Sequence, residues 1–255
     1  MNNYEEKYKK IIKKAIKKGV YRNDRTNVGC YSIFNQNLKI DVSKHFPILT
    51  GRKMFEKTFK TEFEWFINGE TNIKRFKKAG IKIWDNWADE NGDLGPVYGH
   101  QLINFNSQRY NQLKILINNI KINPDSRRHI ISLWNPLQLK EMKLPPCYLY
   151  FQFFIENNKL NMFVLQRSGD LIAGVPYDIA LFTMFLLYIS EKTGYKANKI
   201  NINIIDAHVY KNQLNEANLY LKRKILNLPF YKYKNEKLEI INYKNNGFIK
   251  IPIAV

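Results

Sequence analysis

The sequence has few cysteines: among its 255 residues only Cys30 and Cys147 carry a thiol. Two cysteines cannot build the disulfide framework typical of small secreted proteins. Residues 1–10 also lack the apolar core of a secretory signal, so we expect a reducing, cytoplasmic setting. The most apolar stretch, residues 179–189, has about half of the roughly 20 residues that a membrane-spanning helix needs, which argues against a membrane protein.

Linkers, repeats and low-complexity tails are absent from the sequence as well. With 45% hydrophobic residues, the chain can bury a full core, and single domains extend to about 250 residues before they divide. We therefore expect one domain over residues 1–255. The order of helical and strand patterns predicts an α+β fold with a mixed, largely antiparallel sheet flanked by helices.

Acidic residues are in the minority, with 22 Asp and Glu against 41 Lys and Arg, which gives a formal net charge of +19. A basic surface attracts nucleotides, folate-like polyanions or nucleic acid without specifying one of them. Weak RNA binding through this surface, even as the sole function, is one hypothesis. A solvated lysine face with no partner is the simpler interpretation.

Two segments have the spacing of amphipathic helices. Residues 8–18 place Tyr8, Ile11, Ile12 and Ala15 on one face with lysines on the other, and a glycine follows. Residues 53–68 stack four phenylalanines on one side, and Glu62 occupies the adjoining row. The second pattern predicts a carboxyl group beside aromatic rings, where its pKa is raised.

The segments 147–155 and 160–166 predict an antiparallel hairpin with its turn at 156–158. This pairing brings Cys147 next to Arg167. A fixed guanidinium favours the thiolate and lowers a cysteine pKa, so the pair indicates an activated nucleophile. A small buried core residue is the alternative interpretation of Cys147. Beyond the hairpin, residues 178–191 predict an apolar helix and residues 199–205 a strand that leads into 206–210.

Eight short segments, in order over almost the whole chain, resemble the thymidylate synthase family. They are DRT at 24–26, IWDNWADENGDLGPVYG at 83–99, PDSRR at 124–128, PPC at 145–147, QRSGD at 166–170, GVPYDIA at 174–180, DAHVY at 206–210 and IAV at 253–255. The resemblance implies a homodimer, a pyrimidine deoxynucleotide as substrate, 5,10-methylenetetrahydrofolate as one-carbon donor, and no metal.

The resemblance also implies roles for individual residues. Cys147 would add to C6 of the pyrimidine, with Tyr98 assisting removal of the C5 proton. The implied phosphate contacts are Arg25, Arg167 and Ser168, together with Arg127 and Arg128 reaching across the dimer interface. The implied sugar contacts are His208 and Tyr210. The implied contacts to folate and its proton relays are Glu62, Trp84, Asp170 and the terminal residue Val255, and Asp170 is also a candidate substrate contact.

Asp178 is a departure from the family pattern, because thymidylate synthases carry an asparagine that reads uracil at this position. Cytosine offers an N4 amino donor and an N3 acceptor, which suit a carboxyl group if either that group or N3 carries a proton. The same exchange marks the deoxycytidylate hydroxymethylases and methylases of the family. We therefore expect dCMP as the substrate, with Asp178 reading its edge. A helix N-cap is the structural alternative for Asp178.

Other departures concern the surroundings of the site. Tyr148 replaces the family histidine after the cysteine, and the segments 27–30, 52–53 and 102–103 differ as well. Most cytosine-reading relatives hydroxymethylate, which favours a hydroxymethyl product. Retention of Trp84 and of the IAV terminus instead favours closure against water and a methyl product. The alternatives are therefore dCMP methylation and ordinary thymidylate synthesis from dUMP.

Overall fold

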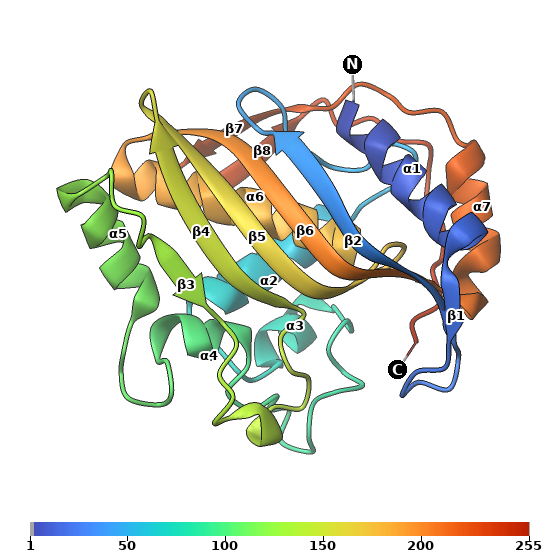
Figure 1. Cartoon of the computed structure of the whole chain (residues 1–255), viewed down its shortest axis with the longest axis horizontal. Coiled ribbons are helices and arrows are strands. Elements are labelled where there is room, and N and C mark those ends of the chain that lie inside the picture. Colours follow the sequence, from blue (N-terminus) through green and yellow to red (C-terminus); the bar gives the residue numbers. More distant parts are fainter. Residues whose placement is uncertain (1–2, 255) are drawn as a thin grey trace.

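The computed structural model describes residues 3–254 and is built around a six-stranded sheet (Figure 1). The strands are β1 (Val20–Arg22), β2 (Cys30–Asp41), β3 (Ile130–Ser132), β4 (Tyr148–Glu156), β5 (Lys159–Asp170) and β6 (Lys196–Tyr210). Their order across the sheet is β1-β2-β6-β5-β4-β3, and every pair is antiparallel except β5 and β6. The predicted mixed, largely antiparallel α+β fold is confirmed.

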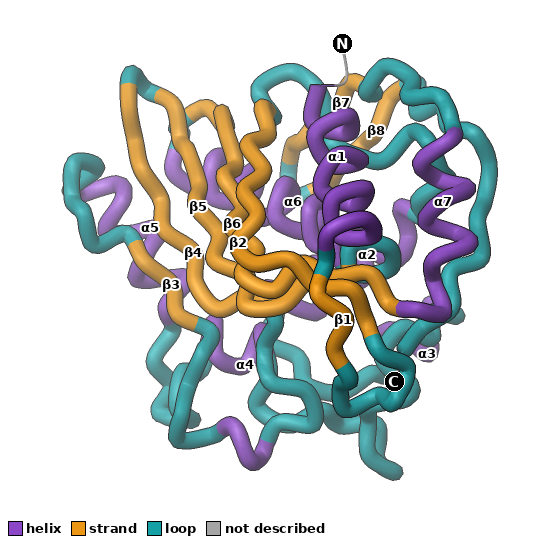
Figure 2. Tube along the Cα trace, turned by 45° about the vertical axis from the view of Figure 1, so that its right-hand side comes forward, coloured by secondary structure: helices purple, strands orange, loops and turns teal. Residues whose placement is uncertain are grey.

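Helices flank this sheet. They are α1 (Asn3–Lys18), α2 (Glu56–Ile67), α3 (Lys74–Ala79), α4 (Tyr98–Ile103), α5 (Gln112–Ile122), α6 (Val175–Thr193) and α7 (Leu214–Lys222), with a small hairpin of β7 (Phe230–Lys234) and β8 (Lys237–Ile241). In Figure 1, α6 and α2 lie behind the sheet, and α6 contacts both β5 and β6. Figure 2 shows α1 and α7 together beside the β1 end of the sheet.

The parallel pairing of β5 and β6 follows from α6, which crosses over between them along one face of the sheet. This helix is almost entirely buried, and its phenylalanines pack against aromatic rings from β4 and α2. In Figure 1 no described element covers the opposite face of β4 and β5. The aromatic layer between α2, α6 and β4 fixes the positions from which Glu62 and Asp178 project.

Most predicted elements are present with shifted ends. The basic amphipathic helix predicted over 8–18 begins earlier, at Asn3, and its four apolar residues are buried as expected. The helix predicted over 53–68 begins only at Glu56, with the partly exposed Phe55 at its N-cap. The helix predicted from residue 178 begins at Val175, because Pro176 fits the first helical turn, where no amide hydrogen is needed.

The hairpin prediction is confirmed. Asn157 and Asn158 form its two-residue turn, and both have positive φ angles, 48° and 60°, as the favoured hairpin turns require. The strand predicted over 199–205 is longer than expected, because β6 continues through Tyr210 between β2 and β5. As a result His208 and Tyr210 are strand residues with fixed directions. Within residues 3–254, no helix has the length and hydropathy needed to cross a membrane.

Candidate active site

Cys147 directly precedes β4 and is half-buried. The backbone amide of Arg167 donates to the carbonyl of Cys147 at 2.8 Å, so the two residues lie opposite each other where β4 and β5 meet. One guanidinium nitrogen, Nη2, lies 4.0 Å from the sulfur. The predicted approach of Cys147 and Arg167 is confirmed, and the alternative of a fully buried core cysteine is not supported.

Arg167 also holds the segment in front of the cysteine. Its Nε donates to the carbonyl of Pro146 and its Nη2 to the carbonyl of Pro145, both at 2.8 Å. The guanidinium lies 5.8 Å from the ring of Trp134. These contacts fix the plane of the guanidinium before any ligand arrives. The third nitrogen, Nη1, takes no part in the bonds to Pro145 and Pro146.

The pKa of Cys147 departs from the prediction. Burial raises the pKa of the thiol above its ordinary value, and Asp178 adds to this, while Arg167, Tyr98 and Arg25 lower it by smaller amounts. The expectation that the guanidinium brings this pKa toward neutrality is therefore wrong, because the loss of hydration of the thiolate outweighs the attraction of the guanidinium. Cys147 is a thiol at neutral pH and needs an acceptor for its proton.

Tyr98 lies against the cysteine. Its hydroxyl accepts a hydrogen bond of 3.0 Å from the Cys147 amide, and its ring is buried between Trp84 and Tyr148, with ring centres 5.8 and 4.6 Å away. Burial raises the pKa of Tyr98 well above its ordinary value. The phenol therefore stays protonated and has a fixed position next to the sulfur.

Glu62 projects from α2 toward the same site. The indole Nε1 of Trp84 donates to Glu62 Oε1 at 3.2 Å. Burial raises the pKa of Glu62 to about 8, with a further increase from Asp178 and a decrease from the Trp84 bond. The predicted raised pKa is confirmed. A carboxyl group that exchanges its proton near neutral pH suits general acid and base catalysis.

Asp178 is the fourth residue of α6, not its N-cap, which is Gly174. The N-cap alternative is therefore wrong. Instead Asp178 Oδ2 accepts a hydrogen bond of 2.7 Å from Nε2 of Gln166 on β5. Burial raises the pKa of Asp178 to about 7, with the Gln166 bond opposing and Asp170 reinforcing the rise.

Glu62 and Asp178 belong to one cluster with the cysteine. The charge of Asp178 raises the pKa of Glu62, Tyr98 and Cys147. Both carboxyl side chains nevertheless keep partial solvent exposure. The structure therefore brings a nucleophile, a phenol and two carboxyl groups together in one partly exposed cluster.

Ser168 and Asp170 lie on β5 directly beside Asp206 and His208 of β6. The Asp170 carboxylate accepts from the amides of residues 172 and 173 at 2.8 and 3.0 Å and from Gln213 Nε2 at 2.8 Å. These three bonds hold the turn into α6. Gln213 also donates to the carbonyl of Pro252 at 3.0 Å and so fixes the chain near its end, a function that sequence reasoning missed.

His208 and Tyr210 lie close together at the end of β6, with ring centres 5.0 Å apart in an edge-on arrangement. Nδ1 of the buried His208 lies 3.3 Å from Asp206 Oδ1. Burial lowers the pKa of His208, but the bond to Asp206 and the charges of Asp170 and Asp206 raise it overall. The two predicted sugar contacts therefore lie side by side at the end of β6, inside the sheet.

The predicted phosphate arginines differ in their placement. Arg25 lies exposed in the turn after β1, and its charge lowers the pKa of Cys147. Arg127 and Arg128 lie exposed in the segment before β3, and in the described part of the chain no side-chain hydrogen bond or ion pair joins them to Cys147. Within the described part of a single chain, Arg25 and Arg167 act on the cysteine, whereas Arg127 and Arg128 make no such contact.

Trp84 and Trp87 form an aromatic wall beside Glu62, with ring centres 5.9 Å apart. The indole Nε1 of Trp87 is buried and has no hydrogen-bond partner within residues 3–254. Aromatic rings beside a carboxyl group suit, by their chemistry, a conjugated molecule with polar edges such as a folate. Val255, predicted to contact folate, lies outside the described residues. No group of three His, Cys, Asp or Glu side chains suited to a metal occurs in the described chain.

A family model described as thymidylate synthase matches residues 6–255, which include every candidate residue named above.

Proposed function

The chain belongs to the thymidylate synthase family, whose members transfer a one-carbon unit from methylenetetrahydrofolate to C5 of a pyrimidine nucleotide, and we propose that its own substrate is dCMP, hydroxymethylated to 5-hydroxymethyl-dCMP. The observation that carries this proposal is the Asp178 carboxyl group. It lies in the same cluster as Cys147, it has one oxygen bonded to Gln166, and burial raises its pKa to about 7.

A carboxyl group in this state suits cytosine. When protonated, Asp178 has one hydroxyl donor for N3 and one acceptor for the N4 amino group. When ionised, it still accepts from N4 but faces O4 of uracil with two acceptors, a mismatch of about 1–3 kcal/mol for the unpaired group. The discrimination therefore follows from the donors and acceptors on the base edge, as it does at other sites built to hydrogen-bond a substrate group.

Cys147 supplies the nucleophile of the proposed reaction. Its thiol would lose its proton to solvent at the partly exposed site, with Arg167 and Arg25 stabilising the thiolate. Bonding of the sulfur to C6 of the pyrimidine would then move the negative charge onto the ring and make C5 the carbon nucleophile. Tyr98 would assist removal of the C5 proton, and Glu62, with a pKa of about 8, would exchange protons with the base. Methylenetetrahydrofolate, when bound, supplies the one-carbon unit, and Trp84, Trp87 and Glu62 would hold it.

The proposed contacts to the rest of the nucleotide are made by the residues described at the site. Arg25, Arg167 and Ser168 would bind the phosphate, and His208 with Tyr210 would bind the sugar hydroxyl. The exposed pair Arg127 and Arg128 would complete the phosphate contacts in a homodimer that covers the open face of β4 and β5. One guanidinium group can donate two parallel hydrogen bonds to two oxygens of a phosphate, which supports this assignment.

A second candidate, a methyl product, is favoured by one observation. Trp84 is buried and bonded to Glu62, and Gln213 fixes the end of the chain at Pro252. Such closure excludes water and favours completion of the transferred methylene group by hydride, which gives a methyl group and dihydrofolate. Completion by water gives the hydroxymethyl group. Methylation of dCMP and thymidylate synthesis from dUMP are the two forms of this candidate.

Incubation of the purified protein with methylenetetrahydrofolate and either dCMP or dUMP separates these functions. We expect turnover of dCMP at a rate at least about tenfold above that of dUMP, without the absorbance increase of dihydrofolate. Preferred turnover of dUMP would overturn the substrate assignment, and dihydrofolate formation would overturn the hydroxymethyl product. Tight, salt-sensitive RNA binding without turnover of either nucleotide, unchanged in Cys147→Ser, would instead support the RNA-binding hypothesis.

A further inference from the structure

The loop that carries Arg127 and Arg128 contains one buried residue. Residues 123–129 connect α5 to β3 at the edge of the sheet (Figure 1). From residue 121 to residue 130 every residue is exposed or half-buried except His129, which is 1% exposed. We call residues 123–128 the arginine loop. The imidazole of His129 is therefore the side chain that anchors this loop to the body of the protein.

The imidazole also closes the arginine loop on itself. Nε2 of His129 lies 3.2 Å from the carbonyl oxygen of Pro124, near the opposite end of the loop. A carbonyl oxygen can only accept, so Nε2 is the donor and carries a hydrogen. The other ring nitrogen, Nδ1, is buried and has no hydrogen-bond partner within residues 3–254. The bond to Pro124 is thus the one hydrogen bond of this side chain in the described chain.

A histidine with one unpartnered nitrogen is a poor choice for packing alone. A buried polar atom without a partner lowers stability, and a hydrocarbon side chain in its place would avoid that loss. The imidazole adds only the Nε2 donor and its bond to the Pro124 carbonyl. Because this bond spans the loop, its contribution is to the shape in which the two arginines are presented.

Two contacts with β4 fix the β3 end of the arginine loop. The Phe153 amide donates to the His129 carbonyl at 2.9 Å, and Gln152 Nε2 donates to the Arg127 carbonyl at 3.3 Å. The His129 ring then ties this fixed end to Pro124. Within residues 3–254 neither arginine side chain has an ion pair or hydrogen bond, so both guanidinium groups are available to an anion.

We propose that His129 is a positioning residue, whose bond to the Pro124 carbonyl holds the arginine loop in the form from which its two arginines bind the nucleotide phosphate. This inference rests on the proposed phosphate contacts of Arg127 and Arg128 across a homodimer. A loop that is ordered before the nucleotide arrives loses less conformational entropy on binding. Loss of the bond should therefore weaken nucleotide binding and leave the chemical step at Cys147 unchanged.

The test compares His129→Phe, which keeps a flat ring and removes both nitrogens, with the wild-type protein in steady-state kinetics on the nucleotide that the wild type prefers. We expect KM for the nucleotide to rise about three- to tenfold, the range for one hydrogen bond, with kcat within about twofold. His129→Gln, which offers an amide donor near the place of Nε2, should restore KM. His45→Phe is the matched control, because Nδ1 of His45 is also buried and unpartnered in the described chain but lies outside this loop.

A mixed dimer separates positioning from a loss of stability. One subunit carries His129→Phe and the other Cys147→Ser, so the one site with a nucleophile receives its arginine loop from the subunit with the intact histidine. We expect this mixed dimer to have the wild-type KM. A KM that stays raised there would show that His129 acts within its own subunit, and it would overturn the inference.

His129→Asn replaces the phenylalanine variant if that variant does not fold, because its shorter amide leaves the Pro124 carbonyl without a donor. An unchanged KM in the His129 variants, beside a raised KM in Arg127→Ala, would overturn the role of His129 alone. An unchanged KM in Arg127→Ala would overturn the proposed phosphate contacts and this inference together.

Discussion

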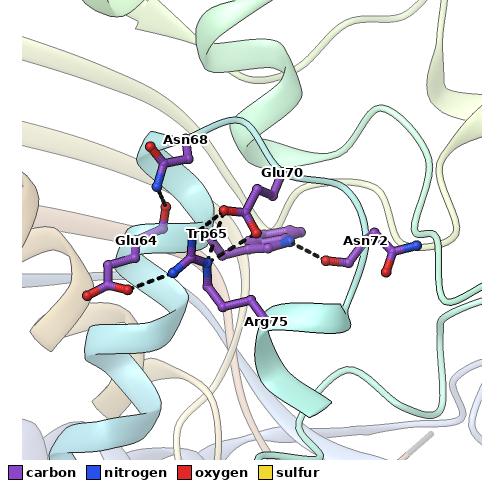
Figure 3. A network of polar contacts seen from close by, with 6 residues as sticks. All are labelled: Glu64, Trp65, Asn68, Glu70, Asn72 and Arg75. Carbon is purple, nitrogen blue, oxygen red and sulfur yellow. Dashed lines mark hydrogen bonds and ion pairs between the residues drawn. The ribbon is translucent and has the colours of Figure 1, made fainter. Parts of the chain in front are cut away.

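The two faces of α2 differ in whether their carboxyl groups are paired with a cation. On the outer face, Glu64 accepts from Arg75 of α3 at 2.8 Å, and Arg75 also donates to both oxygens of Glu70, in the loop after α2, at 3.0 and 3.1 Å (Figure 3). On the inner face, two residues before Glu64, Glu62 has no cation within hydrogen-bond distance in the described chain and only the Trp84 indole as donor. The same helix therefore carries a neutralised surface carboxylate and a buried carboxyl group with a pKa of about 8.

This contrast separates stability from reactivity. Exposed ion pairs such as those of Arg75 contribute modestly to folding because water and salt screen them. Unpaired buried carboxyl groups reduce stability, and their perturbed pKa values are typical of catalytic sites. The inner face should therefore respond to mutation through activity, substrate choice and pH dependence, and the outer face through small changes in stability.

The largest expected effect is the loss of activity in Glu62→Gln. Removal of a positioned proton donor and acceptor should lower kcat at least about 100-fold, the usual range for general acid and base catalysis. Steady-state kinetics would measure it, with Glu64→Gln as the matched control on the outer face of the same helix. Near-equal kcat values for the two variants would show that the inner carboxyl group has no special role.

A stability difference that grows with pH is the next effect. The pKa of Glu62 is raised in the folded protein, so its contribution to stability is present below the unfolded pKa of about 4.3 and is lost as pH rises through about 8. A glutamine at position 62 does not ionise, so the Glu62→Gln variant does not lose this stability as the pH rises. Between pH 5 and pH 9 the variant should gain roughly 2–3 kcal/mol relative to the wild type in urea unfolding. Parallel pH profiles for the two proteins would contradict the buried, unpaired state of Glu62.

Substrate choice should change in Asp178→Asn. An amide at this position offers one donor and one acceptor in the arrangement that uracil requires, so preference should move toward dUMP by about tenfold or more in kcat/KM. Glu70→Gln, in the loop after α2, should leave the preference unchanged. Unaltered selectivity in Asp178→Asn would remove this residue as the reader of the base.

The smallest effect is expected for Arg75→Ala. Its ion pairs with Glu64 and Glu70 are partly exposed, so the free energy of unfolding should fall by about 1 kcal/mol, and less at high salt. Activity should stay within about twofold of the wild type, because the ion pairs of Arg75 within residues 3–254 are with Glu64 and Glu70 and not with a candidate site residue. A large loss of activity in this variant would mean that the two faces of α2 are coupled.

Local sequence patterns predicted much of the fold and part of the site. The alternation of 147–155 and 160–166 around two asparagines was enough to place Cys147 beside Arg167, and helical spacing was enough to place Glu62 on the row of α2 next to its buried phenylalanines. Both predictions depend on residues that are near in sequence or on one element. The resemblance to a known family supplied the roles, which the spacing alone does not give.

Long-range packing decided what the sequence could not predict. The pKa of Cys147 depends chiefly on burial, whose extent is set by tertiary packing, so burial reversed the expected direction. The bond from Gln166 to Asp178 depends on where α6 begins, and a start three residues before Asp178 turns its carboxyl group away from the helix end toward β5. The free indole of Trp87 likewise appears only once its surroundings are packed.

The central claim, that a carboxyl group at position 178 selects cytosine, is tested most directly by competition. The protein would receive equal amounts of dCMP and dUMP with limiting methylenetetrahydrofolate, and mass spectrometry would quantify the nucleotide products. The account predicts that 5-hydroxymethyl-dCMP exceeds any uracil-derived product by at least about tenfold. A product mixture dominated by thymidylate, with dihydrofolate formed in equal amount, would contradict it.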